Sequence, residues 1–406
     1  MIVSAKDWRR PEFKESQELA ASVAEILSHI EKDGDHAIEE FANTFDGKHP
    51  EIIQLKPFEE YDLSDELRDS IKTAAKRIEH FALFQKALLK EQSFSDDFGE
   101  YKQRIHPIER VGAYIPGGRN PLISTALMTL IPAKVAGSSV RIACSPSDHP
   151  ALLAAASLAG ATQFRLLGGV RTIGAFAYGY QDEDKVDLIV GPGNAWVNEA
   201  KKQVQGKVKI DGLAGPSELL ALCDGDQPID WLAKDALAQA EHDPNACSLI
   251  ASDDRDWLEA MHEHLSASEE GKQLMDDRQV DLIHTGSVMD LIEFSEMYAA
   301  EHLMLCHKDI TEDDLTNYGS LFIGANSAVA LGDYISGPNH TLPTLGYARQ
   351  NGGLNVNAYL RIMTVQTITD EGRDALSRAA MPLAEAEGLT QHYESMRIRL
   401  KDKVGH

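Results

Sequence analysis

Between residues 110 and 300, short apolar or β-branched runs alternate with alanine-rich segments of helical character. The runs that read as strands are 111–115, 140–144, 164–167, 186–190, 208–210, 218–223, 248–251 and 280–283. Strands that alternate with helices build βαβ units, in which helices cover both faces of a parallel sheet. This alternation predicts an α/β fold with two Rossmann-like parallel-sheet domains and helical N- and C-terminal extensions.

The pattern of apolar runs and helical segments predicts four parts of the chain. They are an N-terminal helical region (1–105), a first Rossmann-like domain (106–225), a second one (226–345) and a C-terminal helical segment (346–406). Apolar spacing predicts helices over 14–45, broken at Gly34, over about 64–90, and then over 370–380 and 387–403. The two α/β domains suggest an ancient duplication, although no residue-level repeat is evident.

Charge and composition narrow the class of protein. The chain has 406 residues and a formal net charge of −25, which argues against nucleic acid or an anionic membrane surface as a partner. The N-terminus lacks an apolar signal core, and the longest apolar region, 122–137, contains Pro132 and Lys134. We therefore expect a cytoplasmic protein that acts on a small molecule.

Four cysteines, Cys144, Cys223, Cys247 and Cys306, are far apart and form no CxxC motif. Neither a disulfide framework nor a thiolate zinc site is indicated, so any metal here must have nitrogen and oxygen ligands. Cys144 follows a predicted strand and could be a thiol nucleophile for aldehyde oxidation. A small buried hydrophobe is the favoured interpretation.

Four stretches carry residues suited to metal binding or proton transfer. They hold Gln239 with His242, Glu301 with His302, Asp333 with His340, and Glu387 with His392. The first pair is three apart on a predicted helix and would share a face, and the adjacent acid and imidazole could carry two protons. Taken singly, each pair has an ordinary alternative: a solvated helix face, a surface pair, a loop, or an acid at a helix start.

Glycine-marked turns occupy 115–118, 190–194 and 214–217, at ends of predicted strands. In doubly wound folds ligands bind at the carboxyl ends of strands, where backbone N–H groups can approach a phosphate. No GxGxxG fingerprint occurs, so a dinucleotide would not be held by the standard glycine loop. Each turn could also be a simple tight turn.

Together these motifs resemble the histidinol dehydrogenase family over nearly the whole chain. The matching segments include 114–118 (YIPGG), 190–195 (VGPGNA), 214–218 (AGPSE), 238–244 (AQAEHDP), 300–303 (AEHL), 332–344 (GDYISGPNHTLPT) and 387–392 (EGLTQH). The resemblance implies oxidation of L-histidinol to L-histidine through histidinal with two NAD. It also implies a homodimer with shared active sites, one Zn²⁺ per subunit and a C-terminal segment exchanged with the partner.

The resemblance also implies roles for individual residues. Glu301 and His302 match the acid/base pair, and the substrate would contact the zinc ligands, His302 and three further positions. The implied zinc ligands are Gln239, His242, Asp333 and His392, the further substrate positions are Ser217, His340 and Glu387, and the NAD positions are Tyr114, Asn194 and Arg171.

Departures from the family pattern leave alternatives open. Arg171 stands where the family usually has glutamine, which could alter cofactor affinity or favour NADP; Arg119 and the segment 348–354 also differ. Such changes resemble relatives that oxidise another small alcohol, such as a sulfonated diol, because an added cation can meet an anionic group. A metal- or ligand-binding protein without turnover is the non-enzymatic alternative, and the presence of both Glu301 and His302 argues against it.

Overall fold

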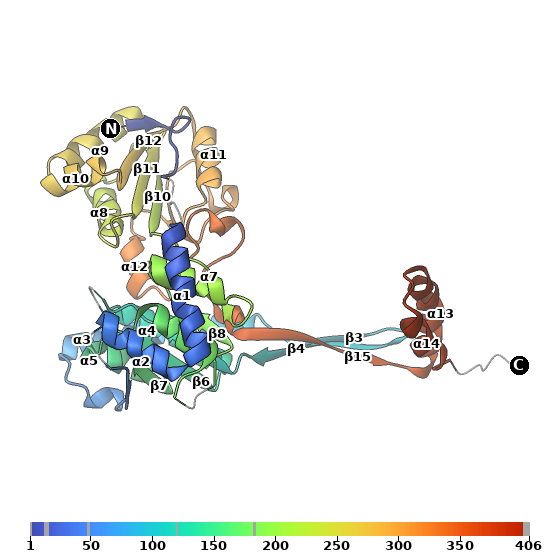
Figure 1. Ribbon diagram of the computed structural model, residues 1–406. Coiled ribbons are helices and arrows are strands. Elements are labelled where there is room, and N and C mark those ends of the chain that lie inside the picture. The colour runs from blue at the N-terminus through green and yellow to red at the C-terminus, as the bar shows by residue number, and fades with distance from the viewer. Residues whose placement is uncertain (1, 12–15, 47–48, 119–120, 182–183, 401–406) are drawn as a thin grey trace, which may run out of the picture. The chain divides into compact units, whose positions relative to one another are not determined.

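The fold is given by a computed structural model that describes residues 2–11, 16–46, 49–118, 121–181 and 184–400. The chain divides into two compact units. One comprises residues 1–85 and 108–359 and holds two six-stranded sheets; the other comprises 86–107 and 360–406 and holds a three-stranded sheet (Figure 1). Within the described residues, no helix is both long enough and apolar enough to cross a bilayer.

The first six-stranded sheet is parallel except for its edge strand β2. Its strands lie in the order β2 (Glu51–Ile53), β7 (Gln163–Leu166), β6 (Val140–Ser145), β5 (Arg110–Tyr114), β8 (Leu188–Val190) and β9 (Lys209–Ile210). Its helices are α1 (Gln17–Asp33), α2 (Asp35–Asp46), α3 (Asp65–Ala87), α4 (Ile123–Ala136), α5 (Pro150–Ala159), α6 (Gly169–Tyr178) and α7 (Ala195–Val204).

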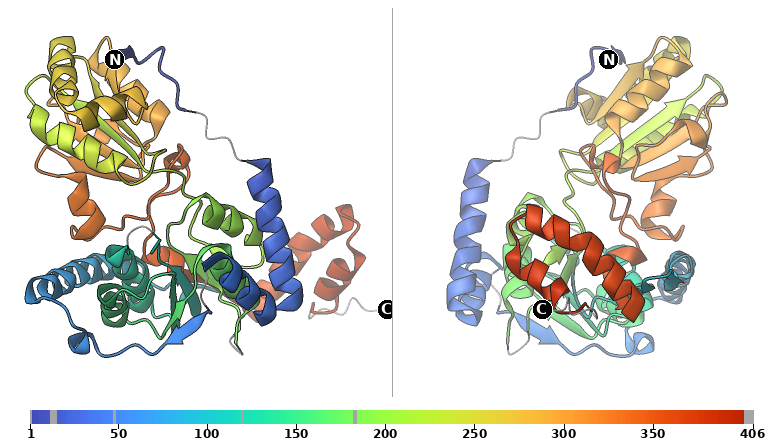
Figure 2. Two further views of the ribbon diagram at one scale, coloured as in Figure 1. Left: turned by 60° about the vertical axis from the view of Figure 1, so that its left-hand side comes forward. Right: turned by 90° about the vertical axis from the view of Figure 1, so that its right-hand side faces the viewer.

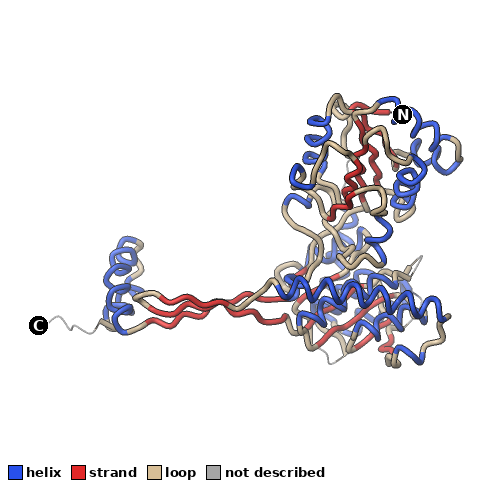
Figure 3. Tube along the Cα trace, turned by 180° about the vertical axis from the view of Figure 1, so that it is seen from behind, coloured by secondary structure: helices blue, strands red, loops and turns tan. Residues whose placement is uncertain are grey.

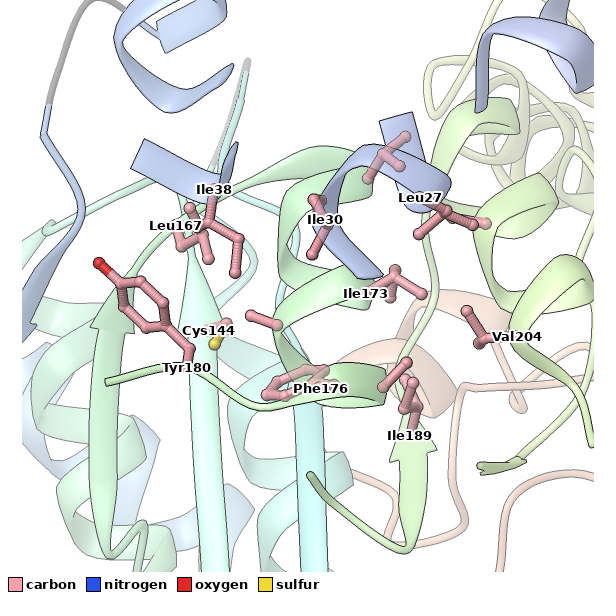
Figure 4. Packing of buried hydrophobic residues seen from close by; sticks show 14 of the residues in the cluster. Leu27, Ile30, Ile38, Cys144, Leu167, Ile173, Phe176, Tyr180, Ile189 and Val204 are labelled. Atoms are coloured by element: carbon pink, nitrogen blue, oxygen red, sulfur yellow. The ribbon is translucent and has the colours of Figure 1, made fainter. Parts of the chain in front are cut away.

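A core of apolar side chains joins α1, α2, α6 and α7 to one face of this sheet (Figure 4). Helices α1 and α2 are separated at Gly34, whose φ of 57° ends the first helix. Helix α1 approaches α6 closely, since a Cβ added at Gly174 would lie 2.7 Å from Cδ1 of Ile30.

The second six-stranded sheet is parallel throughout. Its strands lie in the order β1 (Ile2–Ser4), β12 (Val280–His284), β11 (Cys247–Ser252), β10 (Glu218–Cys223), β13 (His302–Cys306) and β14 (Ser320–Ile323). Its helices are α8 (Ile229–Ala240), α9 (Arg255–Ser266), α10 (Glu269–Asp276), α11 (Val288–Tyr298) and α12 (Val329–Tyr334). Along β10, Leu219 and Ala221 face the cluster with α8 and α9, whereas Leu220 and Leu222 face the cluster with α11.

Both sheets repeat one strand order. The runs β7-β6-β5-β8-β9 and β12-β11-β10-β13-β14 each place their third, second, first, fourth and fifth strands side by side. This doubly wound order confirms the predicted α/β fold class. It is also what the duplication hypothesis predicts.

The second compact unit is a ribbon of three antiparallel strands with two helices (Figure 3). The strands lie in the order β15 (Leu360–Ile368), β4 (Gly99–Pro107) and β3 (Gln92–Ser95). Helices α13 (Asp370–Ala386) and α14 (Thr390–Arg397) pack against each other (Figure 2). Short 3₁₀ helices elsewhere in the chain are η1 (Phe58–Glu60), η2 (Glu312–Asp314), η3 (Tyr347–Arg349) and η4 (Val356–Tyr359).

Three local expectations were wrong. The N-terminal region is not helical throughout, because β1 adds to the edge of the second sheet and β2 to β4 also lie before residue 108. The C-terminal segment includes the nine-residue strand β15, whose β-branched side chains favour an extended chain. Glu387 is not at a helix start: it caps the end of α13, and the next helix begins at Thr390. The boundaries of the four sequence segments remain predictions.

A buried ion pair holds the turn after β8. Nζ of Lys201 contacts Oδ1 of Asp211 and donates to the carbonyl of Gly191 at 3.0 Å, while the Gly191 N–H donates to Asp211 at 2.7 Å. Replacing Lys201 by methionine leaves a buried carboxylate unpaired, so we expect the free energy of unfolding to fall by about 3–5 kcal/mol. Chemical denaturation measures this loss.

The adjacent Lys202→Met variant is the matched control, because the Lys202 side chain is 42% exposed and its surface pair with Glu199 contributes less than about 1 kcal/mol. Replacing Lys201 and Asp211 together by apolar residues should recover part of the loss. Equal stability of the Lys201→Met and Lys202→Met variants would contradict the prediction.

Candidate active site

Glu301 and His302 lie at the start of β13. Helix α11 ends at Tyr298, and the chain then enters the sheet beside β10, where His302 is the register partner of Leu219. The two side chains are 6% and 3% exposed. An acid and an imidazole buried side by side require specific partners, and such a pair indicates a functional site.

One residue of the neighbouring strand holds both groups. The N–H of Glu218 donates to Oε2 of Glu301 at 2.7 Å, and the carbonyl of Glu218 lies 3.1 Å from Nδ1 of His302. A carbonyl can only accept, so Nδ1 carries the proton and Nε2 has a free lone pair. Nε2 lies 3.7 Å from Oδ1 of Asp333.

The surroundings change the proton affinity of both groups. Burial raises the pKa of Glu301, although the adjacent His302 acts in the opposite direction. Burial alone would lower the pKa of His302, but the Glu301 and Asp333 carboxylates outweigh it and raise that pKa. Both groups therefore bind protons more strongly than in water, which suits a pair of bases.

Asp333 and His340 come from α12 and the loop after it. Nδ1 of His340 donates a hydrogen bond to the Asp333 carbonyl at 2.8 Å, so its Nε2 carries no proton. That Nε2 accepts a hydrogen bond from the Thr125 hydroxyl at 3.1 Å. Burial lowers the pKa of His340. A cavity of about 340 Å³ is lined by both His302 and His340. A cavity of about 430 Å³ beside β2 and α5 contains none of the predicted site residues.

Gln239 and His242 lie at the end of α8. Gln239 is 2% exposed, and its Nε2 has no hydrogen-bond partner within the described parts of the chain. His242 is not on the helix as expected: α8 ends at Ala240, and His242 follows in an exposed turn with Nδ1 3.1 Å from the Ala238 carbonyl. Its Nε2 is therefore free to bind a metal.

These donors fit zinc by their chemistry. Helix α8, which carries Gln239, contacts α12, which carries Asp333. An imidazole nitrogen, a carboxylate and an amide oxygen form a nitrogen and oxygen donor set that Zn²⁺ accepts. The amide oxygen of Gln239 would be its metal-binding atom, because the amide nitrogen is a donor and cannot bind a cation.

The predicted metal ligands come from both compact units of the chain. Among the described residues, no group of three or more His, Cys, Asp or Glu side chains is placed to hold a metal. His392 lies in α14 and Glu387 between α13 and α14, both in the second unit. Their roles remain predictions.

The residues predicted to contact the cofactor lie on the first sheet. Tyr114 ends β5, and Asn194 follows β8 and caps α7, accepting the Val197 N–H at 3.1 Å. Strands β5 and β8 are neighbours where the winding of the sheet reverses, which is the usual ligand position in such folds. A Cβ at Gly191, whose φ is 111°, would lie 2.1 Å from the Tyr114 carbonyl, so this turn requires glycine.

Arg171 lies in the first turn of α6, is 7% exposed and places its guanidinium 5.5 Å from the ring centroid of Phe45. Its cofactor contact remains a prediction. Arg119, another departure from the family pattern, lies outside the described residues.

The third glycine turn differs from the first two. Residues 214–217 precede β10, and Ser217 accepts the Cys247 N–H at 3.0 Å. This turn and the Glu301–His302 pair thus lie at amino ends of strands of the second sheet, whereas Tyr114 and Asn194 lie at carboxyl ends of the first. Cys144 is fully buried and burial raises its pKa to about 12, which confirms that it is a structural side chain.

Two contributing residues were missed by the sequence reasoning. Glu218 acts through its backbone, and a backbone contact leaves no signal in the sequence. The one available signal is that the apolar run 218–223 begins with an acidic residue, which is unusual. Thr125 binds His340 from α4, and a hydroxyl within an apolar helix gives no indication of this contact.

Comparison with known proteins identifies the family of this chain. The family model "Histidinol dehydrogenase" matches residues 9–400. Histidinol dehydrogenases of Thermus thermophilus and Halobacterium salinarum are 39% and 40% identical over 389 and 400 residues, covering 92% and 94% of this chain and 93% of each relative. The crystal structure of histidinol dehydrogenase from Elizabethkingia anophelis superposes with a TM-score of 0.88 at 33% identity, covering 97% of this chain and 94% of that one. With its buried acid and imidazole at the start of β13, this chain belongs to the histidinol dehydrogenase family.

Proposed function

We propose that this enzyme oxidises L-histidinol to L-histidine through histidinal, with two NAD, as the last steps of histidine biosynthesis in the cytoplasm. The observation that carries the proposal is the buried Glu301–His302 pair, in which Nε2 of His302 has a free lone pair and the side chain lines a cavity. Family membership supports the substrate.

Gln239, His242 and Asp333, with His392 of the partner subunit, would hold one Zn²⁺ per site in a homodimer. The ion, when bound, supplies a fixed template that orients the substrate through its imidazole and amine nitrogens. Support for this assignment comes from the free Nε2 of His242 and from the contact between α8 and α12, which carry Gln239 and Asp333.

His302 is the base for both oxidations. Its Nε2 takes the hydroxyl proton as the alcohol carbon loses a hydride to NAD, which gives the aldehyde. The Nδ1 contact to the Glu218 carbonyl keeps the basic nitrogen directed away from β10. As water adds to the aldehyde, Nε2 returns its proton to the former aldehyde oxygen. The same nitrogen can then remove a proton from the hydrate as the second hydride leaves to NAD.

Glu301 serves the hydration step between them. A carboxylate whose pKa is raised by burial is a better base for water than an exposed one. It removes a proton from the attacking water, and the resulting hydrate is the substrate of the second oxidation. The aldehyde stays bound during this step, which protects a reactive intermediate.

The remaining predicted residues would bind rather than react. Ser217, His340 and Glu387 would contact the substrate. Tyr114, Asn194 and Arg171 would contact NAD, and the position of Tyr114 and Asn194 at the ends of β5 and β8 supports this role.

The proposal predicts two NADH per L-histidinol, measured as the absorbance change at substrate exhaustion. In the Glu301→Gln variant the hydration step loses its base, so the aldehyde step should slow by about 100-fold or more. The early yield should then approach one NADH per histidinol, and a carbonyl reagent should trap histidinal.

Activity on an anionic diol such as dihydroxypropanesulfonate, without turnover of histidinol, would overturn the substrate assignment. A higher kcat/KM with NADP than with NAD would overturn the cofactor assignment and point to Arg171.

A further inference from the structure

Glu218 connects the catalytic pair to the N-terminal segment. Its backbone binds Glu301 and His302, and its side chain is 3% exposed and points to a different partner. That partner is Arg10, whose Nη1 forms an ion pair with Oε1 of Glu218. The backbone and the side chain of one residue are thus both engaged at the start of β10.

Arg10 is itself held firmly. Its Nη2 donates to the Tyr298 carbonyl, and its guanidinium lies 4.0 Å from the centroid of the Tyr298 ring. The segment before it is anchored as well, because β1 pairs with β12 and the Trp8 indole donates to Asp281 at 2.8 Å. Tyr298 ends α11, three residues before Glu301.

The charge balance gives this contact a role beyond packing. A buried carboxylate without a cation must take up a proton or move towards solvent, and either change disturbs the strand that carries it. Any shift of the Glu218 backbone moves its N–H and carbonyl together. Those two groups set the direction of the Glu301 carboxylate and the tautomer of His302.

We propose that Arg10 is a positioning residue of the active site: by neutralising and holding the Glu218 side chain, it fixes the backbone groups that orient Glu301 and His302. This inference rests on the proposed function of that pair. Because one residue holds both groups, the loss of Arg10 slows both the alcohol and the aldehyde oxidation.

The test compares the zinc-loaded dimer of four proteins: wild type, Arg10→Met, Arg10→Lys and the control Arg9→Met. Arg9 is exposed, and within the described residues its guanidinium donates only to the carbonyls of Lys6 and Trp8. Its replacement therefore removes the same charge without affecting Glu218. Zinc content and circular dichroism are measured on every sample.

In Arg10→Met we expect kcat per zinc-loaded site to fall by about 10- to 100-fold in both half-reactions, with KM for histidinol within about threefold of wild type. Arg10→Lys keeps the cation but lacks the planar fork, and should recover part of kcat. Arg9→Met should match wild type. A kcat within twofold of wild type in folded, zinc-loaded Arg10→Met overturns the proposal, as does a loss fully accounted for by missing zinc.

Two further measurements cover the remaining outcomes. If Arg10→Met does not fold, Glu218→Gln tests the same link, because it removes the charge pair and keeps the backbone; an unchanged kcat then overturns the proposal. If wild type does not oxidise histidinol, the proposed function fails on its own. Hydrogen exchange in the peptide that spans 217–223 then decides, and equal uptake in Arg10→Met and Arg9→Met overturns the positioning role.

Discussion

Replacing His302 by asparagine should lower kcat by about 10²- to 10⁴-fold for both histidinol and histidinal, the usual range for a lost general base. Asparagine keeps an N–H near the position of Nδ1 and can still donate to the Glu218 carbonyl. The variant therefore removes the basic Nε2 and disturbs the neighbouring strand little. Single-turnover NADH formation from each substrate measures the two steps separately.

The pattern across variants is more informative than one rate. His302→Asn should affect both steps equally, whereas Glu301→Gln should affect mainly the step that starts from the aldehyde. The Kd for NAD, measured by quenching of protein fluorescence, should stay within about threefold of the wild-type value in His302→Asn. If histidinol oxidation persisted at the wild-type rate in this variant, another base would have to remove the hydroxyl proton.

Removal of zinc should abolish turnover while leaving the fold intact. Gln239, His242 and Asp333 lie on or directly after α8 and α12, which contribute side chains to a buried apolar core. A substrate without its template loses its orientation, and because well-oriented reactions gain several kcal/mol, we expect turnover to fall by more than about 10³-fold. Dialysis against a chelator, circular dichroism and restoration with one equivalent of Zn²⁺ measure this.

Variants of individual ligands sharpen the zinc prediction. Asp333→Ala and Gln239→Ala should each lower the zinc content at limiting free metal. His264→Gln removes an exposed histidine on α9 and should keep one zinc per subunit. Full activity of the metal-free protein, or an unchanged zinc affinity in Asp333→Ala, would contradict the assignment.

Mixed dimers can test the proposal that the partner subunit supplies His392. Mixed dimers made from His302→Asn and His392→Ala chains would contain one intact site if His392 comes from the partner, and no intact site if it does not. Only the first case restores activity, because neither variant forms an intact site when both chains of the dimer carry the same substitution.

Local signals in the sequence were sufficient for most of the first unit's elements. Strand β10 begins and ends as the apolar run 218–223 predicts, and α1 ends where Gly34 interrupts the helical spacing. These features depend on neighbouring residues, since periodicity, helix caps and turn glycines act over a few positions. The motifs with Glu301, His302 and Asp333 could likewise be recognised in the sequence, because the type of side chain determines which chemistry is possible.

Contacts between distant segments were decided by the tertiary structure. Strand β1 was predicted to belong to a helical region, yet it forms the edge of the second sheet. Strand β15 pairs with β4, which is more than 250 residues away in the sequence. Both pairings depend on which strand edge is available in the folded chain. The site at the amino ends of β10 and β13 depends on the Glu218 backbone, whose N–H and carbonyl are common to almost every residue type. The sequence by itself determined which groups could react; the fold alone decided how Arg10, Glu218 and the acid/base pair meet, because a hydrogen bond or ion pair between distant residues exists only once the chain has brought them together.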